Sequence, residues 1–331
     1  MLNLFVRYLG SSDIANGCRC YWVLRRERFA GGSAVVSEKL RFTHRDLLYE
    51  RLRTVDTQIA EYSFSNLYLF RDTHEYEVIL DKELFVKGLS YDGYRYLMPT
   101  RIVGDLQLAY LKSLLAEVDF LFPIPENWLS YFSDTEFSSG YRDGDMDYIY
   151  TVDRMSTYHG RALHKKRNLL KQFLKCYKHV AASLSEDRRE AALFILQEWQ
   201  SETGLDIAQT DYLPCREALN LSEQLMLCGG IFYADDEPAG FVLGEQMGTE
   251  TFVLHFAKAR KKFRGVYQYM FNNFARILPA KYRYLNFEQD IDRDSLRSAK
   301  ASYAPDYMLK KFRVSLRKDT RTKKEISLPE P

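Results

Sequence analysis

The sequence predicts an α+β protein made of two halves that share one plan. With 331 residues and 46% hydrophobic content, the chain has enough apolar side chains for two cores. Short strand-like runs occur in groups of three, and each group is followed by a helical pattern and one more strand. Because this order occurs twice, we expect two mixed sheets, each with a three-stranded antiparallel meander followed by a helix and a strand.

The first copy of the plan spans 75–124. Its meander strands are expected at 76–80, 84–87 and 94–98. A helix follows, because apolar residues recur on one helical face: Leu108, Leu111, Leu115 and Val118. A strand over 120–124 ends this half, and helical segments over 45–53 and 63–70 precede it.

The second copy spans 231–288. Its meander strands are expected at 231–234, 240–246 and 251–258. The helix that follows has one apolar face: Val266, Met270, Phe274 and Ile277. A strand over 282–288 ends the half, and helical segments over 162–177 and 186–201 precede it.

These patterns divide the chain into four segments. We expect a poorly ordered extension over 1–40, an N-terminal half over 41–150, a C-terminal half over 151–315 that carries the candidate site, and a basic tail over 316–331. The extension lacks sustained periodicity. The tail is rich in Lys, Arg and Thr, which is typical of a frayed terminus.

Composition argues against several classes of protein. No run reaches the roughly 18 to 20 apolar residues that cross a bilayer. The five cysteines are odd in number, and no two pairs of ligands have the spacing of a zinc site. We therefore expect a soluble, cytoplasmic protein with free thiols, no metal site and no tightly bound cofactor.

A basic turn lies between the predicted strand 251–258 and the helix that starts near Val266. Its sequence runs Lys-Ala-Arg-Lys-Lys-Phe-Arg-Gly over 258–265. A glycine turn at a helix N-terminus presents backbone N–H groups and a positive dipole end to an anion. We therefore interpret part of this turn and the helix start as a candidate phosphate site: Lys262, Arg264, Gly265 and Tyr267. The alternative is a solvated basic turn.

A second basic element lies on the helix predicted over 162–177. No acidic residue occurs between Asp153 and Glu186, although the net charge of the chain is only +2. The cations form a stripe opposite an apolar face, so we expect the helix to pack on the protein with a basic ridge outward. Its crowded first turn follows Gly160 and is a second candidate anion site: His164, Lys165, Lys166 and Arg167. The alternative is a solvated helix face.

Three titratable residues are candidates for the chemistry itself. Glu288 and Asp290 follow the last predicted strand, where they could bind a substrate ammonium or act as a base. The alternative is a surface pair that caps the helix near Asp294. His255 lies inside an apolar strand and is a candidate base, with a hydrogen-bonded core histidine as the alternative.

The order of the elements and several motifs carry a resemblance to a known family. Helices, a meander, a helix and a strand are the order of the GNAT acyltransferase fold, and two copies predict a tandem GNAT protein. From about Leu40 to Phe312, runs of this chain resemble the family of the phosphatidylglycerol lysyltransferase C-terminal domain, and more closely its stand-alone cytosolic members, often left as a domain of unknown function. The runs are Glu61–Leu67, Asp147–Tyr150, Gly160–Asn168, Val253–Ala259, Phe263–Gln268, Asn286–Asp290 and Lys300–Pro305.

The resemblance implies a domain that moves an amino acid from aminoacyl-tRNA to a lipid hydroxyl. In the named enzymes a multi-pass membrane domain accompanies it, and no such segment occurs in these 331 residues. Two residues depart from the expected pattern. Tyr267 stands where GNAT enzymes usually have a small residue in the pyrophosphate turn, and Ala257 stands where related proteins commonly carry Glu.

Three functions remain open from the sequence. We favour an aminoacyl-tRNA-dependent aminoacyltransferase with an unidentified acceptor, with tRNA as partner and a lipid as one class of acceptor. The second is a coenzyme A-dependent N-acyltransferase, with acyl-CoA as donor substrate. The third is a non-catalytic module that binds RNA or another anion through the two basic elements.

Overall fold

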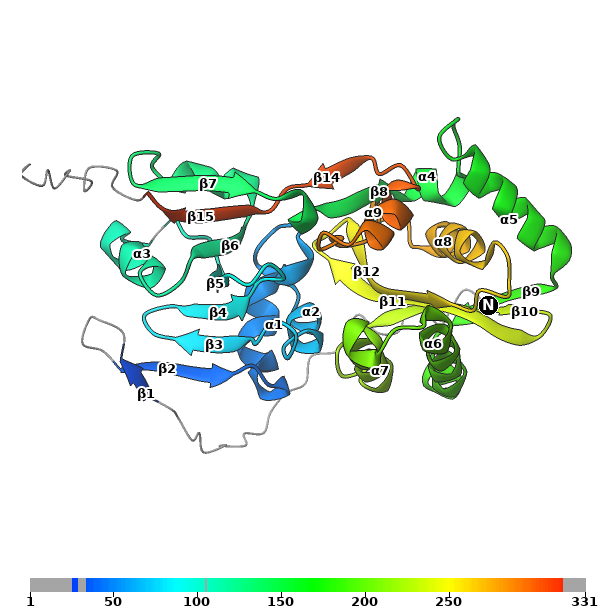
Figure 1. Cartoon of the computed structure of the whole chain (residues 1–331), viewed down its shortest axis with the longest axis horizontal. Helices are drawn as coiled ribbons and strands as arrows, with labels where there is room; N and C mark the ends of the chain where they lie inside the picture. The colour runs from blue at the N-terminus through cyan, green and yellow to red at the C-terminus, as the bar shows by residue number, and fades with distance from the viewer. Residues whose placement is uncertain (1–25, 29–33, 105, 318–331) are drawn as a thin grey trace, which may run out of the picture.

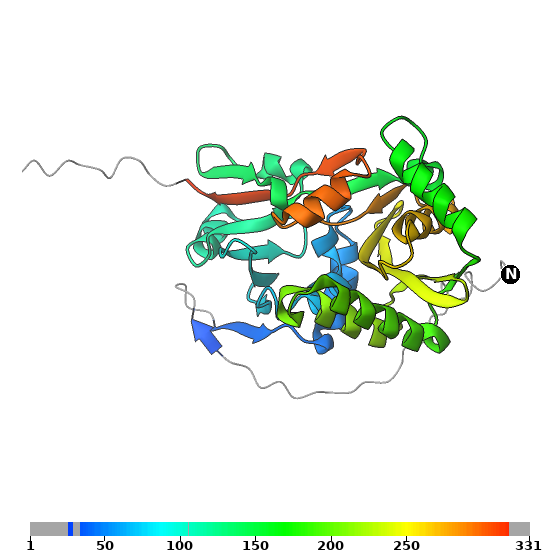
Figure 2. The same ribbon diagram turned by 45° about the vertical axis from the view of Figure 1, so that its right-hand side comes forward.

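Two mixed β-sheets lie at opposite ends of the long axis of the molecule (Figure 1). The structure is a computed structural model that describes residues 26–28, 34–104 and 106–317. Within this part of the chain the sheets have eight and seven strands. Helices α1 and α2 lie between them (Figures 1 and 2).

The first sheet contains the predicted N-terminal meander. Its strands, in spatial order, are β1 (Arg26–Arg28), β2 (Ala34–Lys39), β3 (Glu77–Leu80), β4 (Leu84–Leu89), β5 (Arg95–Pro99), β6 (Phe120–Ile124), β15 (Phe312–Leu316) and β7 (Phe137–Tyr141). The pairs from β2 to β5 are antiparallel, and β5 pairs with β6 in parallel. The parallel pair follows from the crossover through a helix.

The second sheet repeats this arrangement. Its strands, in spatial order, are β14 (Tyr307–Leu309), β8 (Asp147–Thr151), β13 (Tyr284–Asn286), β12 (Thr251–Ala259), β11 (Glu237–Met247), β10 (Cys228–Ala234) and β9 (His179–Ser183). Strands β10, β11 and β12 form the antiparallel meander, and β12 pairs with β13 in parallel. Both predicted meanders and both crossovers are therefore present.

Helices cover both faces of the second sheet. On one side lie α4 (Val152–Thr157), α5 (His164–Cys176), α8 (Val266–Ile277) and α9 (Asp294–Ala301), and on the other α6 (Arg189–Thr203) and α7 (Tyr212–Asn220) (Figure 1). The remaining helices are α1 (Arg45–Arg53), α2 (Phe64–Leu69) and α3 (Leu108–Leu115). Short 3-10 turns are η1 (Phe42–His44), η2 (Ala60–Tyr62), η3 (Glu126–Tyr131), η4 (Asp143–Asp145), η5 (Glu186–Arg188) and η6 (Ile207–Gln209).

The two halves exchange a strand. After β7 the chain leaves the first sheet, and β8 inserts between β13 and β14 of the second sheet. After β14 the chain returns, and β15 inserts between β6 and β7 of the first sheet (Figure 1). Each sheet is therefore completed by a strand from the other half, which the periodicity of the sequence did not reveal.

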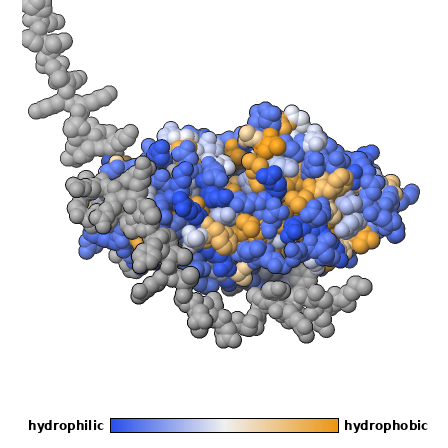
Figure 3. All heavy atoms as spheres, turned by 90° about the horizontal axis from the view of Figure 1, so that it is seen from below, coloured by the Kyte–Doolittle hydropathy of each residue, from blue (hydrophilic) through white to orange (hydrophobic). Residues whose placement is uncertain are grey.

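The hydrophobic cores do not follow the predicted division between the halves. One core extends from the first sheet through α1 and α2 to α6, α7 and one face of the second sheet. The other fills the opposite face of the second sheet, beneath α4, α5 and α8. Seen from below, the molecule shows separate groups of apolar residues among hydrophilic ones (Figure 3).

The segment boundaries expected from the sequence differ in three places from these elements. Strand β2 lies within the expected extension over 1–40 and pairs with β3. Strand β8 starts within 41–150 but belongs to the second sheet, and β15 lies at the end of 151–315 but belongs to the first. The sequence division missed both because pairing partners distant in the chain leave no local signal. Most of the expected extension, and 318–331 of the expected tail, lie outside the described residues.

Candidate active site

The site is built where strands β12 and β13 stop pairing. Their parallel ladder covers only 251–253 and 284–286, whereas β12 continues to Ala259. On its other side β12 pairs with β11, and the register skips His255 between the pairs of Leu254 and Phe256. His255 is thus the extra residue of a β-bulge, a feature that redirects a side chain and often borders an active site.

His255 is clamped between two glutamates. Its Nε2 lies 2.9 Å from Oε1 of Glu245 on β11, and its Nδ1 lies 2.7 Å from Oε1 of Glu288 after β13. The imidazole is 0% exposed. Burial opposes its charge, but hydrogen bonds to both glutamates and their negative charge outweigh burial and raise the pKa of His255 to about 10. At neutral pH the ring is therefore a cation that donates from both nitrogens.

The N-terminal half completes this clamp through the start of α2. The Ser63 hydroxyl donates to Oε1 of Glu245, and the Asn66 amide donates to Oε1 of Glu288 at 2.9 Å. Ser63 is also the N-cap of α2, since its hydroxyl accepts from the Asn66 backbone N–H. The helix cap thus fixes the two donors relative to each other, and the site joins both halves of the molecule.

Each glutamate uses only one of its two oxygens in this clamp. Among the described residues, no donor lies within hydrogen-bonding distance of Oε2 of Glu245 or of Glu288. The Glu245 and Glu288 side chains are 10% and 14% exposed, in contrast to the fully covered His255. The clamp therefore reaches solvent through its carboxylates.

Glu288 is held in an unusual backbone conformation. Its φ of 59° lies in the left-handed region, which costs energy for a residue other than glycine. The Asn286 side chain accepts from the Glu288 N–H at 2.6 Å, and the Lys300 ammonium donates to the carbonyls of Glu288 at 3.2 Å and Gln289 at 2.5 Å. Burial lowers the pKa of Lys300 to about 8, against the attraction of the nearby Glu288, Asp147 and Asp290 carboxylates.

Asp290 lies apart from the clamp. Its carboxylate is 1% exposed and accepts from the Tyr148 hydroxyl at 2.7 Å and from two nitrogens of Arg297 at 2.9 and 3.1 Å. Its Oδ1 also accepts from the Asp292 backbone N–H. This geometry gives Asp290 the role of an internal ion pair that fixes the turn before α9.

The basic turn over 258–265 is largely neutralised by acidic side chains. Lys258 contacts Asp211 at 2.6 and 2.8 Å and lies 3.7 Å above the Trp199 ring. Lys262 contacts Glu237 at 2.5 Å. Arg264 is exposed, and it has no ion-pair partner among the described residues. Arg264 is thus the predicted site cation of this turn that stays available to a ligand.

The start of α8 is packed against its neighbours. Gly265 is its N-cap with a φ of 88°, and a Cβ atom there would lie 2.5 Å from the Leu169 carbonyl of α5. The Tyr267 side chain is mostly covered, and burial raises its pKa to about 12. The N-terminus of α8 therefore lies close against α5, and position 265 has no room for a residue larger than glycine.

Helix α5 divides the four residues of its basic first turn into two pairs. Lys166 donates to the Ser302 hydroxyl at 2.6 Å and lies 3.8 Å above the Tyr303 ring, while Arg167 donates to the Tyr158 carbonyl. His164 and Lys165 are exposed. The predicted ridge is also present further along the helix, where Lys171 and Lys175 are exposed without an acidic partner among the described residues.

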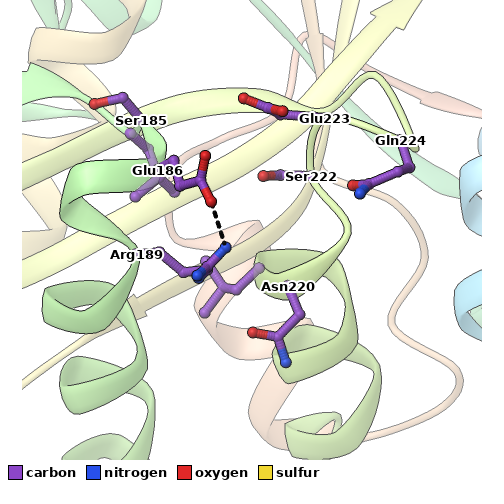
Figure 4. A pocket seen from close by; sticks show the side chains of 9 residues that line it. Ser185, Glu186, Arg189, Asn220, Ser222, Glu223 and Gln224 are labelled. Atoms are coloured by element: carbon purple, nitrogen blue, oxygen red, sulfur yellow. Dashed lines mark hydrogen bonds and ion pairs between the residues drawn. The ribbon is translucent and has the colours of Figure 1, made fainter.

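Two pockets lie outside the histidine clamp. One, of about 380 Å³, lies at the Gly160 turn before α5 and is lined by Thr151, Asp153, Arg154, His159, Gly160, Arg161, Ala162 and Asp306. The other, of about 50 Å³, lies between the start of α6 and the end of α7, where Glu186 pairs with Arg189 and Asn220 lies on the far side of Arg189 (Figure 4). Both are polar, and neither contains His255, Glu245 or Glu288.

Two of the five clamp residues were predicted from the sequence, and three were not. His255 and Glu288 were candidates, but Glu245, Ser63 and Asn66 were not. Ser63 and Asn66 lie in the run Glu61–Leu67 that carried the family resemblance, so that run could have drawn attention to them. Glu245 is an acid within the apolar strand β11, which is itself a signal, because a buried carboxylate needs a partner.

The described part of the chain holds neither a cluster of ligands for a metal ion nor a helix that is long and apolar enough to cross a membrane. Residues 52–315 match the family described as phosphatidylglycerol lysyltransferase, C-terminal. This match confirms the resemblance predicted from the motifs.

Similar solved structures confirm the predicted α+β, tandem GNAT-like fold. A conserved protein of unknown function from Bacteroides thetaiotaomicron is 24% identical, with 85% of this chain and 99% of that chain covered and a TM-score of 0.72. The C-terminal domain of a protein designated a lysylphosphatidylglycerol synthetase, from Agrobacterium fabrum, is 12% identical, with coverages of 82% and 92% and a TM-score of 0.54. FemX is 9% identical, with coverages of 85% and 97% and a TM-score of 0.53.

Proposed function

This chain belongs to the family of the phosphatidylglycerol lysyltransferase C-terminal domain, and on that premise we propose that it transfers an amino acid from aminoacyl-tRNA to an acceptor. Its family and its fold support an aminoacyltransferase-like function. The tRNA donor, the acceptor and a cytoplasmic location are parts of the proposal. The clamp around His255 is the proposed site for the aminoacyl group.

The charge of the clamp is the observation that carries this proposal. Two carboxylates and one imidazolium sum to −1, and each carboxylate keeps Oε2 without a donor among the described residues. One ammonium group would neutralise this charge and satisfy the free oxygens. Every aminoacyl ester carries such a group. An acyl-CoA has none at its acyl end unless the acyl group is itself an amino acid.

His255 acts in this proposal by holding the two glutamates. Both of its nitrogens donate, so the ring has no free lone pair with which to accept a proton. Its positive charge lets two carboxylates lie close together without protonation. We therefore assign binding of the ammonium to Glu245 and Glu288, and assign the spacing of these two residues to His255.

The transfer itself needs alignment more than covalent catalysis. A hydroxyl or amine of the acceptor attacks the ester carbonyl, loses one proton, and expels the 3′-terminal ribose oxygen of the tRNA, which gains one proton. The bond to the ribose breaks as the bond to the acceptor forms, so no other reactant is needed. Fixing the ammonium at the clamp would place the carbonyl and reduce the entropic part of the barrier.

Helix α5 is the proposed contact for the tRNA backbone. Its exposed cations Lys165, Lys171 and Lys175 have no acidic partner among the described residues, and Arg264 is exposed near the start of α8. Lysines on one helix face contact phosphates and do not distinguish between bases. This suits a tRNA donor that is recognised mainly through the ammonium group of its amino acid. A phosphatidylglycerol hydroxyl is the first acceptor to test, because the family's description names that lipid.

Replacement of Glu288 by Gln tests the function. This change keeps the shape of the side chain and removes its charge, so transfer from a pool of labelled aminoacyl-tRNAs should slow at least tenfold, which is about 1.4 kcal/mol in the barrier. The measurement is single-turnover transfer of label to phosphatidylglycerol vesicles or to a soluble extract. The matched control is Glu250→Gln, since Glu250 forms an exposed ion pair with Arg283 at 3.4 Å.

Two results would overturn the proposal. Equal transfer by wild type and Glu288→Gln would show that the clamp is not the site of the aminoacyl group. Micromolar binding of coenzyme A, measured by calorimetry, would favour the acyltransferase alternative. We expect no such binding, because Tyr267 stands where GNAT enzymes usually have a small residue in the pyrophosphate turn.

A further inference from the structure

A buried lysine lies where the two exchanged strands cross. Lys311 immediately precedes β15, which returns to the first sheet, and Asp147 opens β8, which enters the second. The Lys311 ammonium lies 2.8 Å from Oδ1 of Asp147, and both side chains are 0% exposed. The crossing point is therefore an ion pair in the interior, where an unpaired charge is very costly.

Lys311 also contacts two other segments. Its ammonium lies 2.8 Å from both oxygens of Glu61, in the 3-10 turn before α2, and donates to the Gln289 side chain at 2.6 Å. Glu61 is two residues before Ser63, and Gln289 is one residue after Glu288. A single ammonium thus holds the ends of two segments that both enter the histidine clamp.

The two segments form the two arms of the site. The first arm, Glu61–Asn66, supplies the donors to Glu245 and Glu288. The second arm, Asn286–Gln289, carries Glu288 itself. Asp147 joins the arms further, because its Oδ2 accepts from the Ala60 N–H at 3.1 Å and from the Asn286 amide at 2.9 Å.

We propose that Lys311 is a positioning residue for the clamp: its ammonium fixes the Glu61–Asn66 arm and the Asn286–Gln289 arm at the spacing that lets both glutamates accept hydrogen bonds from His255. Lys311 touches neither His255 nor either clamp glutamate, so it acts through the two arms. The inference rests on the proposed function only in taking the clamp as the site. The geometry it describes can be tested without any substrate.

Arg313 provides a matched comparison on the same segment. It is also a cation at the strand crossing, 10% exposed, and pairs with Asp92 and with Asp145 at 2.8 Å each. Neither of these acids belongs to an arm of the clamp. Loss of Arg313 should therefore destabilise the place where the exchanged strands cross, as loss of Lys311 does. It should leave the two arms of the clamp in position.

The charges around Lys311 suggest how to remove it without unfolding the protein. Lys311→Met alone would leave Glu61 and Asp147 buried without a cation, which is strongly destabilising. Burial already raises the pKa of Glu61 to about 7, against the attraction of Lys311. The double variant Lys311→Met, Glu61→Gln removes one charge of each sign. Gln289→Ala is a milder variant, because it removes one partly exposed contact of Lys311 and no charge.

Nitrogen-15 NMR of the histidine rings at pH 8 gives the readout. In wild type and in Arg313→Met, both ring N–H groups of His255 should be visible and slow to exchange with water. In the folded double variant at least one of these signals should be lost. In Gln289→Ala the Nδ1–H that faces Glu288 should exchange faster, while the Nε2–H that faces Glu245 should not change.

The positioning role would be overturned if both ring N–H groups exchanged in the double variant as they do in wild type. If the double variant does not fold, the same result in Gln289→Ala would overturn it. A loss of the signals in Arg313→Met equal to that in the double variant would also overturn it, because general weakening of the crossing would then be the cause. The proposed function fails separately, if Glu288→Gln transfers label as fast as wild type. The two results are independent, since the NMR experiment contains no donor or acceptor.

Discussion

The two halves carry different side chains at equivalent positions of their ladders. In the C-terminal half, His255 and Glu288 lie two residues beyond the last pair of β12 and β13, and Glu245 pairs with Val253 of that last pair. In the N-terminal half, the last pair of β5 and β6 is Leu97 with Leu121. Counted in the same way, the equivalent residues are Pro99, Pro123 and Lys87.

The difference shows that the shared backbone plan does not by itself make a site. At the positions of the clamp the N-terminal half has Pro99, Pro123 and Lys87. Neighbouring residues of β5 and β6 carry packed aromatic rings, with Tyr96 and Phe122 at a centroid distance of 5.3 Å and Phe120 and Phe122 at 6.3 Å. In our proposal the C-terminal half therefore holds the site, and the N-terminal half contributes the donors Ser63 and Asn66. The two halves differ in residue type at all three of these equivalent positions.

The largest effect on stability should come from the aromatic side of this comparison. Phe122 is 5% exposed, and Phe122→Ala should lower the free energy of unfolding by about 3–5 kcal/mol, through lost burial and the cavity that remains. Because Phe122 carries no charge, this loss should be the same at pH 6 and pH 10. Denaturant unfolding at the two pH values measures this loss. A loss that varied strongly with pH would contradict the view that Phe122 stabilises the N-terminal half by apolar packing alone.

His255→Gln should have a smaller effect that depends on pH. The folded-state pKa of about 10 exceeds the ordinary value of 6.5, so the stability from the charged ring is complete below about pH 6.5 and is lost as the pH rises through 10. We expect Gln to cost about 3 kcal/mol near pH 6.5, because one partner of a buried ion group is removed. The cost should shrink steadily towards pH 10.

Denaturant unfolding of wild type and His255→Gln from pH 6.5 to 10 measures how the difference in their free energies of unfolding changes with pH. Phe122→Ala serves as the control whose cost does not change. A constant cost for His255→Gln from pH 6.5 to 10 would mean that the ring is neutral in the folded protein, and the charge argument for the site would then be lost.

The smallest effect on stability should come from the basic ridge of α5. Lys165, Lys171 and Lys175 are exposed, so their joint replacement by Ala should change the free energy of unfolding by no more than roughly 0.5 kcal/mol per site. Binding of tRNA should weaken. A plot of the logarithm of the association constant against the logarithm of the salt concentration should also become less steep, by up to about 0.9 for each lost phosphate contact. Filter binding at several salt concentrations measures both quantities.

Helix α1, which precedes the first meander, supplies the control for the ridge. It carries Asp46 and Glu50 as well as arginines, so its charge is mixed where that of α5 is uniformly positive. Arg53→Ala should leave the affinity and the salt slope unchanged. If the α5 variant also left them unchanged, the ridge would be a solvated surface and the RNA contact would lie elsewhere.

The sequence by itself determined the fold class and the family, and it singled out two residues of the candidate site. Hydrophobic periodicity is a local property, so both meanders, both crossover helices and the parallel strands could be predicted from it. The motifs marked the segments that meet at the clamp, including the run with Ser63 and Asn66. His255 and Glu288 stood out because a polar residue in or after a buried strand needs an explanation.

Only the tertiary structure decided which of the predicted residues work together. The contact of Ser63 with Glu245 joins residues 182 positions apart, and that of Lys311 with Glu61 joins residues 250 apart. No local pattern encodes such pairings, nor the exchange of β8 and β15. Burial and charged neighbours are also set by the folded chain, so the same histidine that the sequence suggested as a base is a cation in the structure. The acids that neutralise the basic turn come from other elements for the same reason.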